Sequence, residues 1–341
     1  MEPQPITLTR HIIEKQADHP DATGEFSIIM AQIALAAKII ARNMSLAGLI
    51  DVLGKTGEVN VQGESVEKLD KKANDTFVRV FEYHGGLVRS LVSEEMDKPL
   101  FVGPPLSSGR RQGKYALFFD PLDGSSNVNC NFTVGSIFSV HRVAEPSTLD
   151  SEVNLLKSGS EQVAAGYLLY GPSTVLVYSY GKGVHQFTLD PGIGEFVLSS
   201  DHIQIPSRGK VYSVNEGNYD KWPSGTQRFI DYLTANDKAT GRPYSGRYSG
   251  CLVADVHRLL SSGGVYLYPA ETGKAEGKLR LMYEAAPLAF IVEQSGGKAS
   301  TGTQRIMDIR PGTVHQRVPL IIGSREEVSL AEDFIQGRRN G

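Results

Sequence analysis

The segment FFDPLDGSSN, residues 118–127, restricts the fold more than any other part of the sequence. It begins inside the apolar run YALFF, so Asp120 stands where a buried strand is expected to end. Pro121 fixes one backbone angle and Gly124 permits a sharp turn, so Asp120 and Asp123 could face one point. Open α/β sheets place ligand sites at the carboxyl ends of strands, and we therefore expect a site here.

Carboxylates at one point suit a hard divalent cation such as Mg²⁺, whose shell is often completed by a phosphate. Backbone amides of Gly124, Ser125 and Ser126 could form a nest for that phosphate. Asp and Ser are also ordinary turn residues, so the segment alone is explained equally well by a plain turn. A second acid pair, Glu94 and Glu95, ends the apolar run LVRSLV. Adjacent acids repel one another without a cation, so the two pairs together favour a metal site.

Two further acids are candidates of lower weight. Glu284 stands among apolar residues in KLRLMYEAAP, and a buried acid needs a partner, although an exposed helical acid would fit the same pattern. Asp70 follows Leu69 within a helical pattern, where its spacing alone indicates a solvated charge.

Basic and aromatic residues gather late in the chain. Arg and Lys suit phosphate, and Tyr suits phosphate oxygens or the face of a sugar. Each residue alone could be an ordinary surface residue, but beside an acidic metal site the group predicts a phosphorylated polyol or sugar as ligand. The group comprises Asn215, Arg247, Tyr248, Tyr268, Lys278 and Arg280.

Composition excludes several classes of protein. The 341 residues suffice for one large or two medium domains, and we place a boundary near residue 200, dividing 1–200 from 201–341. The 35 basic and 38 acidic side chains give a net charge of −3, which favours no nucleic-acid partner. The most apolar segment, residues 26–44, contains Gln32, Lys38 and Arg42, so it predicts a core helix and no membrane span.

The start MEPQPITLTR lacks the pattern of a secretory signal, and the two cysteines are too few for a disulfide framework. We expect two buried thiols, Cys130 and Cys251, in a cytoplasmic protein.

Apolar periodicity predicts an α/β or α+β fold. A second helix is expected over residues 65–85 with Ser65 as its N-cap, after a loop over 54–64. Later helices are expected over 227–235 and 280–297. Strands are expected in 86–95, 114–120, 135–143, 210–217, 263–269 and 318–324, with a hairpin over 174–190 that turns at Gly181–Gly183.

The motifs and their order resemble class I fructose-1,6-bisphosphatase of the bacterial type over nearly the whole chain. DPLDGS alone is shared with the wider superfamily of metal-dependent phosphatases, and the later motifs make the resemblance specific. The motifs are LVSEEM, FDPLDGSSN, AAGYLLYGP, SVNEGN, GRYSGCLVADVHRLL, LYPA, GKLRLMYEAAP and VHQRVPLIIGS.

The resemblance implies a layered α-β-α-β-α sandwich with an AMP-regulated N-terminal half and a substrate-binding C-terminal half, assembled as a homotetramer. The implied reaction is hydrolysis of the 1-phosphate of fructose 1,6-bisphosphate to fructose 6-phosphate and phosphate, a step of gluconeogenesis. Two or three Mg²⁺ ions per subunit are implied, with Mn²⁺ as an alternative.

The resemblance also assigns roles to residues. Asp70 and Glu95 match the pair that activates the attacking water, and the turn at 124–126 would hold the 1-phosphate. Arg247 matches an arginine that reaches the 6-phosphate of a neighbouring subunit. Asn218 stands where a phosphate-binding tyrosine is common, and Tyr219 is a candidate substitute. The implied metal ligands are Glu94, Asp120, the carbonyl of Leu122, Asp123, Glu284 and, in a loop where many members have Asp, Glu64.

Inhibition by AMP is implied by a separate group of matches. Its alternative is a simple helix-capping motif at TGEFS. The matched residues are Thr23, Gly24, Glu25, Phe26, Ser27, Lys114, Tyr115 and Arg142.

Three alternative functions stay open at this point. Sedoheptulose 1,7-bisphosphate would suit the same motifs. Inositol monophosphate is disfavoured because Arg247, Tyr248 and Lys278 suit a second phosphate. A catalytically silent AMP-sensing scaffold is disfavoured because the core acids are present.

Overall fold

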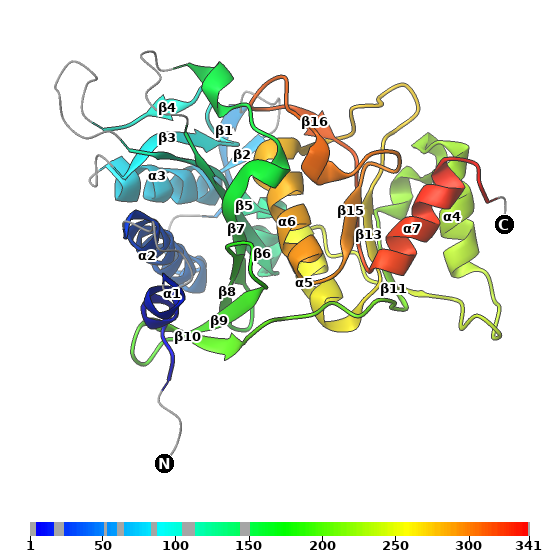
Figure 1. Ribbon diagram of the computed structural model, residues 1–341, viewed down its shortest axis with the longest axis horizontal. Helices are drawn as coiled ribbons and strands as arrows, with labels where there is room; N and C mark the ends of the chain where they lie inside the picture. The colour runs from blue at the N-terminus through cyan, green and yellow to red at the C-terminus, as the bar shows by residue number, and fades with distance from the viewer. Residues whose placement is uncertain are drawn as a thin grey trace.

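The computed structural model describes residues 5–16, 24–50, 53–59, 65–82, 87–103, 113–143 and 151–339. These parts form five layers of helix and sheet (Figure 1). The order across the molecule is helices, a large sheet, helices, a small sheet and helices, which confirms the expected α-β-α-β-α sandwich.

The large sheet has eight strands in the order β10-β9-β8-β7-β6-β5-β3-β4. β3 and β5 are parallel, and the other neighbours in this sheet are antiparallel. Its strands are β3 (Val88–Ser93), β4 (Leu100–Phe101), β5 (Tyr115–Asp123), β6 (Val134–Arg142), β7 (Gln162–Tyr170), β8 (Thr174–Ser179), β9 (His185–Asp190) and β10 (Glu195–Ser200).

The small sheet has five strands in the order β12-β11-β13-β17-β15, and two short pairs, β1 with β2 and β14 with β16, lie outside both sheets. The strands are β1 (Lys55–Val59), β2 (Ser65–Glu67), β11 (Val211–Ser213), β12 (Ser245–Gly246), β13 (Val265–Tyr268), β14 (Leu279–Arg280), β15 (Lys298–Ser300), β16 (Arg317–Val318) and β17 (Leu320–Gly323).

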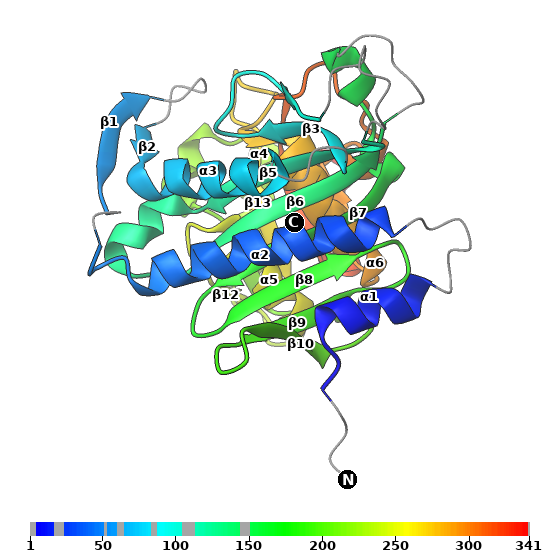
Figure 2. The ribbon, with the colours of Figure 1, turned by 90° about the vertical axis from the view of Figure 1, so that its left-hand side faces the viewer.

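Three helices cover the outer face of the large sheet, where Figure 2 shows them crossing its strands. Two lie between the sheets, and two cover the far face of the small sheet (Figure 1). In that order they are α1 (Leu8–Gln16), α2 (Glu25–Ser45) and α3 (Lys68–Glu82), then α5 (Leu252–Ser262) and α6 (Ala286–Gln294), then α4 (Ser224–Thr234) and α7 (Arg325–Ile335).

Strand β5 is apolar along its length because both of its faces are covered. Phe119 faces the outer helices, and its ring stacks on Phe77 of α3 with centroids 4.8 Å apart. Phe118 faces inward and packs with Met282 and Tyr283, which precede α6. The expected strand therefore exists, but it does not end at Asp120 as predicted.

Instead β5 continues to Asp123 through a bulge. Asp120 is opposite Ile137 of β6, and Asp123 is opposite Gly135, so three steps on β5 match two on β6. The extra residue restores the alternation of side chains, and it places both carboxylates on the inner face of the sheet. The turn predicted at Pro121 occurs at Gly124, where φ is +75°.

The long helices follow their predicted faces. Ile29, Ile33, Ala36 and Ile40 of α2 are buried, as expected for the segment 26–44. On α3 the four residues predicted to share one buried face are all in the core, namely Leu69, Ala73, Phe77 and Phe81.

Two predictions near α3 were wrong. The helix begins at Lys68, and Ser65 belongs to strand β2, so Ser65 is not its N-cap. The segment 54–64 was expected to be a loop, but Lys55–Val59 pairs antiparallel with β2 as strand β1. Gly57, with φ of +85°, interrupts the alternation by which such a strand is recognised.

The β8–β9 hairpin is confirmed, as are the predicted strands in 86–95, 114–120, 135–143, 210–217, 263–269 and 318–324. The helix over 227–235 is confirmed by α4. The segment 280–297 divides into strand β14, a π-helical turn over Leu281–Ala285 and helix α6. Cys251 is buried, but Cys130 is exposed, contrary to expectation.

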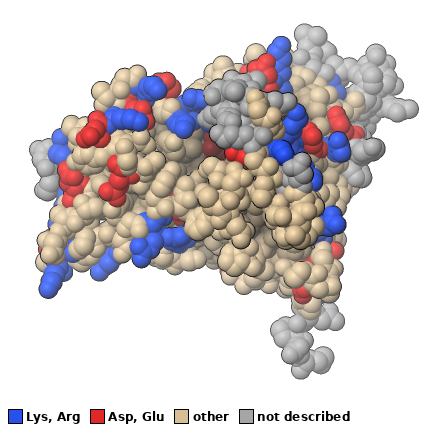
Figure 3. Space-filling view, turned by 180° about the vertical axis from the view of Figure 1, so that it is seen from behind, with Lys and Arg blue, Asp and Glu red and all other residues tan. Residues whose placement is uncertain are grey.

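No helix in the described parts of the chain is long and apolar enough to cross a lipid bilayer. Basic and acidic side chains are interspersed over the face seen in Figure 3, as the small net charge predicts.

Candidate active site

Four of the predicted acids come together between the large sheet and α6. Asp120 and Asp123 reach this position from the bulged end of β5. Glu94 follows β3, and its backbone N–H donates to the carbonyl of Phe119 at 3.2 Å, which places it beside Asp120. Glu284 enters from the π-helical turn before α6. The sequence-predicted cluster therefore consists of side chains from three separate elements.

The electrostatics of this cluster are unfavourable for the protein alone. Burial raises the pKa of Asp120 well above its usual value, and the charges of Glu94, Asp123 and Glu284 raise it further. Burial and the charge of Glu94 likewise raise the pKa of Glu284, while Arg280 opposes this. Arg280 is buried, and its Nη2 lies 3.3 Å from Glu94 Oε1. One guanidinium faces several carboxylates, so the cluster attracts additional positive charge.

Asp123 is held by the start of helix α5. Its carboxylate accepts hydrogen bonds from the backbone N–H groups of Leu252 at 3.2 Å and Val253 at 2.7 Å. The Cys251 thiol donates to the same carboxylate at 3.0 Å. Burial raises the pKa of Asp123, and these three hydrogen bonds oppose that increase.

Cys251 was not predicted to take part in the site, because it is remote in sequence from Asp123. The motif GRYSGCLVADVHRLL was the only signal that could have indicated its position. Asp255 of α5 was also missed. It is buried and accepts hydrogen bonds from Ser213 Oγ at 2.7 Å and from the Ser249 N–H at 3.1 Å.

The turn that carries Glu284 is fixed on both sides. Its carboxylate accepts a 2.6 Å hydrogen bond from the backbone N–H of Arg280. Ser139 of β6 donates to the carbonyl of Met282 at 3.2 Å, which anchors the turn to the large sheet. The π-helical turn thereby directs an otherwise core-facing segment toward the other acids.

Asp70 lies at the start of α3 and is buried, contrary to the solvated charge that its spacing indicated. It accepts hydrogen bonds from the Glu67 N–H at 3.0 Å and from Ser125. Burial raises its pKa to about 8, with a further contribution from the charge of Glu95. The structure thus brings both members of the proposed base pair, Asp70 and Glu95, to the turn after β5.

That turn depends on Gly124. A Cβ atom there would lie 2.7 Å from the Cβ of Cys251, in addition to the strain of a φ of +75°. The next residues, Ser125–Cys130, form a 3₁₀ helix, and Asn127 Nδ2 donates to the carbonyls of Thr133 and Ser249 at 3.1 Å. The turn is therefore packed against the start of α5.

Three of the predicted substrate residues, Asn215, Tyr248 and Tyr268, line one pocket at the end of the small sheet. Burial raises the pKa of Tyr248, and the charges of Tyr268, Asp255 and Asp123 raise it further, so this pocket adjoins the acid cluster. Its other lining residues are Val214, Asn218, Trp222, Leu267, Pro269 and Glu271.

The remaining substrate residues lie elsewhere. Arg280 is within the acid cluster. Arg247 and Lys278 are exposed and do not line the pocket, and Arg247 Nη1 donates to the carbonyl of Gly246 at 2.8 Å. Tyr219 donates its hydroxyl to Asp231 of α4 at 2.8 Å and is outside the pocket lining, whereas Asn218 belongs to it.

The residues matched to an AMP site also converge. Gly24 precedes α2 with φ of +77°, and Glu25 begins the helix. Tyr115 and Arg142 are opposite each other on β5 and β6. Burial raises the pKa of Tyr115, the charge of Glu25 raises it further, and Arg142 lowers it, so these three side chains are neighbours.

Lys114 joins them through its carbonyl, which accepts from the N–H of Val143 at 2.8 Å. Phe26 and Ser27 follow in the first turn of α2. Thr23, like the predicted metal ligand Glu64, lies outside the described residues.

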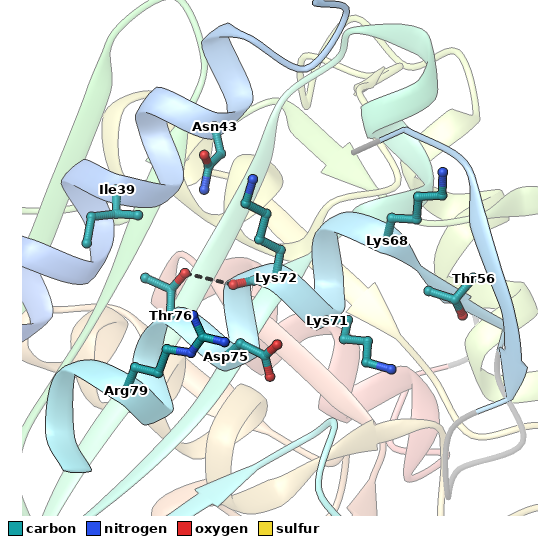
Figure 4. Close-up of a pocket in the computed structure, with 9 residues that line it drawn as sticks. All are labelled: Ile39, Asn43, Thr56, Lys68, Lys71, Lys72, Asp75, Thr76 and Arg79. Atoms are coloured by element: carbon teal, nitrogen blue, oxygen red, sulfur yellow. Dashed lines mark hydrogen bonds between the residues drawn. The ribbon is translucent and has the colours of Figure 1, made fainter. Parts of the chain in front are cut away.

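A second pocket, which sequence analysis missed, lies between α2, β1 and α3 (Figure 4). Cations on α3 and polar groups on α2 and β1 line it, and no predicted catalytic or substrate residue does. The lining residues are Ile39, Asn43, Thr56, Lys68, Lys71, Lys72, Asp75, Thr76 and Arg79.

The acid cluster fits a hard divalent cation by its donor chemistry, since it offers buried carboxylates with too little positive charge nearby. The backbone carbonyl of Leu122 is in the same segment, whose N–H donates to Asp120 at 2.9 Å. However, among the described residues, the only potential ligand atoms from three acidic, His or Cys side chains within 4.8 Å of one another belong to another site. Asp123 is directed to α5 and Glu94 to Arg280, so rotations of these side chains would accompany metal binding.

Comparisons with known proteins cover both halves of the chain. The family model "Fructose-1-6-bisphosphatase, N-terminal domain" matches residues 6–201, and "Fructose-1-6-bisphosphatase, C-terminal domain" matches residues 205–336. "Fructose-1,6-bisphosphatase class 1" of Chloroherpeton thalassium is 51% identical over 339 residues, covering 98% of this chain and 95% of that protein.

The protein of the same name from Crocosphaera subtropica is 53% identical over 336 residues, covering 98% of this chain and 92% of its own. The crystal structure of Leishmania major fructose-1,6-bisphosphatase in holo form is similar with a TM-score of 0.89. It is 43% identical and covers 98% of this chain and 100% of its own.

Proposed function

Because the chain belongs to the class 1 fructose-1,6-bisphosphatase family, we propose that it hydrolyses the 1-phosphate of fructose 1,6-bisphosphate, giving fructose 6-phosphate and phosphate. The observation that supports this most directly is the position of the acid cluster beside the pocket of Asn215, Tyr248 and Tyr268. An acid-lined reaction centre next to a sugar-sized polar pocket suits a sugar bisphosphate. We place the AMP-regulated domain at residues 1–200 and the substrate domain at 201–341, in a cytoplasmic homotetramer.

The acids would hold two or three Mg²⁺ ions, or Mn²⁺. The ligands would be Glu94, Asp120, Asp123, Glu284 and the carbonyl of Leu122, with Glu64 completing the set. When bound, the cations supply positive charge to the phosphoryl oxygens during transfer.

The protein's own groups perform the remaining tasks. Asp70 and Glu95 accept the proton of the attacking water. A carboxylate whose pKa is raised to about 8 is a stronger base than an ordinary one, and burial gives Asp70 that property. The backbone amides of Gly124, Ser125 and Ser126 hold the 1-phosphate in line with the water.

The second phosphate determines the choice of substrate. Asn215, Tyr248 and Tyr268 hold the sugar and the 6-phosphate from within the subunit, with Lys278 at the rim. Arg247 is exposed and directed away from its own pocket, so it serves the site of a neighbouring subunit.

The proposal is tested by phosphate release from fructose 1,6-bisphosphate with Mg²⁺ or with a chelator. Sedoheptulose 1,7-bisphosphate and inositol monophosphate serve as competing substrates. We expect Mg²⁺-dependent turnover with the highest kcat/KM for the fructose substrate. A clear preference for inositol monophosphate, or no turnover by a folded tetramer, would reject the substrate assignment.

Inhibition by AMP is tested separately with Arg142→Ala. We expect this variant to keep its kcat and to lose most of its sensitivity to AMP, because its charge lies beside Tyr115 and Glu25 at the start of α2. Lys182→Ala, an exposed cation in the β8–β9 turn, is the matched control and should remain sensitive. Equal inhibition of both variants would place the AMP site elsewhere.

A further inference from the structure

A histidine-rich cluster lies at the β10 edge of the large sheet, remote from the acid cluster. His11 comes from α1, His185 begins β9, and Asp201 directly follows β10. Strands β8, β7 and β6 separate β9 from β5, on which the catalytic acids lie. Figure 2 shows α1 beside β9 and β10, and the Leu198 N–H donates to the carbonyl of Ile6 at 2.8 Å, which joins the start of α1 to this edge.

The two imidazole rings are buried, with exposed fractions of 3% for His11 and 0% for His185, and their centroids are 4.6 Å apart. Each ring has one nitrogen engaged. His11 Nδ1 is 2.9 Å from the Tyr178 hydroxyl, and His185 Nδ1 is 2.5 Å from Asp201 Oδ1. The Nε2 atom of each ring has no hydrogen-bond partner among the described residues.

Two buried imidazole nitrogens without partners are costly in a folded protein unless something binds them. Histidines that ligate metals usually have the other ring nitrogen held by a carboxylate or another polar group, as both are here. Burial lowers the pKa of His11 to about 4, and the charge of His185 contributes. Both rings are therefore neutral at physiological pH, which is the form that binds metal.

We propose that His11, His185 and Asp201 form a second metal site, specific for a divalent transition metal such as Zn²⁺. One potential ligand atom from each of the three residues lies within 4.8 Å of the others. Two imidazoles and a carboxylate favour Zn²⁺ over Mg²⁺, which prefers oxygen ligands. The site would join α1 to the edge of the large sheet, a structural role separate from the proposed hydrolysis.

Binding requires a small contraction of the cluster. Ligand atoms around a tetrahedral Zn²⁺ lie about 3.3 Å apart, given bonds of about 2.0–2.1 Å. Asp201 can supply the movement because its side chain is 45% exposed. Lys15 on α1 contributes an opposing positive charge, while Glu14 and Asp201 contribute negative charge. His202, whose Nε2 is 4.0 Å from Asp201 Oδ1, is near enough to take part after rotation.

The test measures Zn²⁺ binding to the full-length protein by titration calorimetry in a large excess of Mg²⁺, which occupies carboxylate sites but not imidazoles. We expect one Zn²⁺ per chain to persist under these conditions and to raise the temperature of unfolding. A second titration uses Asp120→Asn/Glu284→Gln, in which the acid cluster is disabled, and should give the same stoichiometry.

His11→Gln and Asp201→Asn should weaken this binding by roughly tenfold or more, since second-shell losses alone reach that size. His257→Gln is the matched control, because His257 also has Nδ1 bonded to a tyrosine, Tyr167, but is outside the cluster. Asp201→Asn guards against misfolding, because its side chain is partly exposed. Co²⁺ in place of Zn²⁺ should give the visible spectrum of a nitrogen-containing tetrahedral site.

Complete displacement of Zn²⁺ by Mg²⁺ would overturn the proposal, as would undiminished binding in both His11→Gln and Asp201→Asn. Neither result bears on hydrolysis of the sugar bisphosphate, so failure here is distinguishable from failure of the proposed function.

Discussion

Gly124 is the residue on which the geometry of the acids and the phosphate turn most directly depends. Replacement by Ala adds a Cβ 2.7 Å from Cys251 at a φ of +75°, so the turn or helix α5 must shift. A displacement of about 1 Å at a reaction centre can reduce kcat roughly a hundredfold, and we expect a loss of that order. Steady-state phosphate release measures it.

Gly194→Ala is the control for Gly124→Ala. Gly194 also has a positive φ, +67°, but a Cβ there would meet nothing within 4 Å. Both variants carry the backbone strain of about 1 kcal/mol, and only Gly124→Ala adds the clash. If the two variants lost activity equally, the contact with Cys251 would not be the cause.

Asn218 and Tyr219 provide a second test at the scale of single residues. Asn218 lines the substrate pocket, so Asn218→Ala should raise KM roughly tenfold with little change in kcat. Tyr219→Phe removes only a hydroxyl that donates to Asp231, and KM should stay near the parent value. A larger change in KM for Tyr219→Phe than for Asn218→Ala would restore Tyr219 as the phosphate ligand.

Single residues differ in how well sequence could identify them. Asp120, Asp123 and Glu94 were found because each ends an apolar run, and that signal is local. Cys251 and Asp255 were missed because their partners are remote in sequence. Asp70 seemed solvated, since its burial depends on how α3 packs on the turn after β5.

At the scale of elements, β6 contains a histidine that makes stability depend on pH. His141 is buried, and its ring packs edge-on against Phe118 with centroids 5.0 Å apart. Neither ring nitrogen has a hydrogen-bond partner among the described residues. Burial lowers the pKa of His141 to about 3, and the charge of Lys157 lowers it further.

The sign of the effect follows from proton binding. Between about pH 3 and pH 6.5 the folded protein holds fewer protons at His141 than the unfolded chain does. The free energy of unfolding therefore decreases as pH falls below 6.5, by up to about 1.4 kcal/mol per pH unit for this one group. His141→Leu should reduce that slope and raise stability at pH 5 relative to the parent.

Urea unfolding of the chelator-treated protein at pH 5 and pH 7.5 measures this difference. His202→Leu is the control, because its side chain is 57% exposed. An unchanged pH dependence in His141→Leu would show that other groups determine acid stability.

Elements with a strong apolar period were predicted from sequence, and those without it were not. The faces of α2 and α3 and the hairpin β8–β9 follow local periodicity. Strand β1 and the π-helical turn before α6 escaped it, since a glycine interrupts the first and a continuous apolar run hides the second. The end of β5 was wrong because a bulge, which depends on pairing with β6, carries the strand past Asp120.

At the scale of the whole molecule, the five layers place several chain segments around one reaction centre. The order of layers was expected from the resemblance to a family, since periodicity alone allowed only α/β or α+β. Both faces of β5 are covered within this arrangement, which explains why acids at its end are buried and need a cation. The position of Arg247 outside its own pocket extends the same reasoning to the assembly.

If Arg247 serves a neighbouring subunit, two inactive variants should restore activity when their subunits are mixed. Arg247→Ala lacks the donated arginine, and Asp120→Asn lacks a metal ligand of its own site. In a mixed pair, the Asp120→Asn subunit donates its intact Arg247 to the intact acids of the other. Random pairing leaves about a quarter of the sites complete, so roughly a quarter of parent activity should return.

The control mixes Asp120→Asn with Glu284→Gln, whose defects lie in the same acid cluster of each chain. Every site then contains a defect, and no recovery is expected. Subunits are mixed by unfolding and refolding together, and exchange is verified with a mass-tagged chain. Verified exchange without recovery for Arg247→Ala would mean that Arg247 acts within its own subunit, and the active site would then be complete in a single chain.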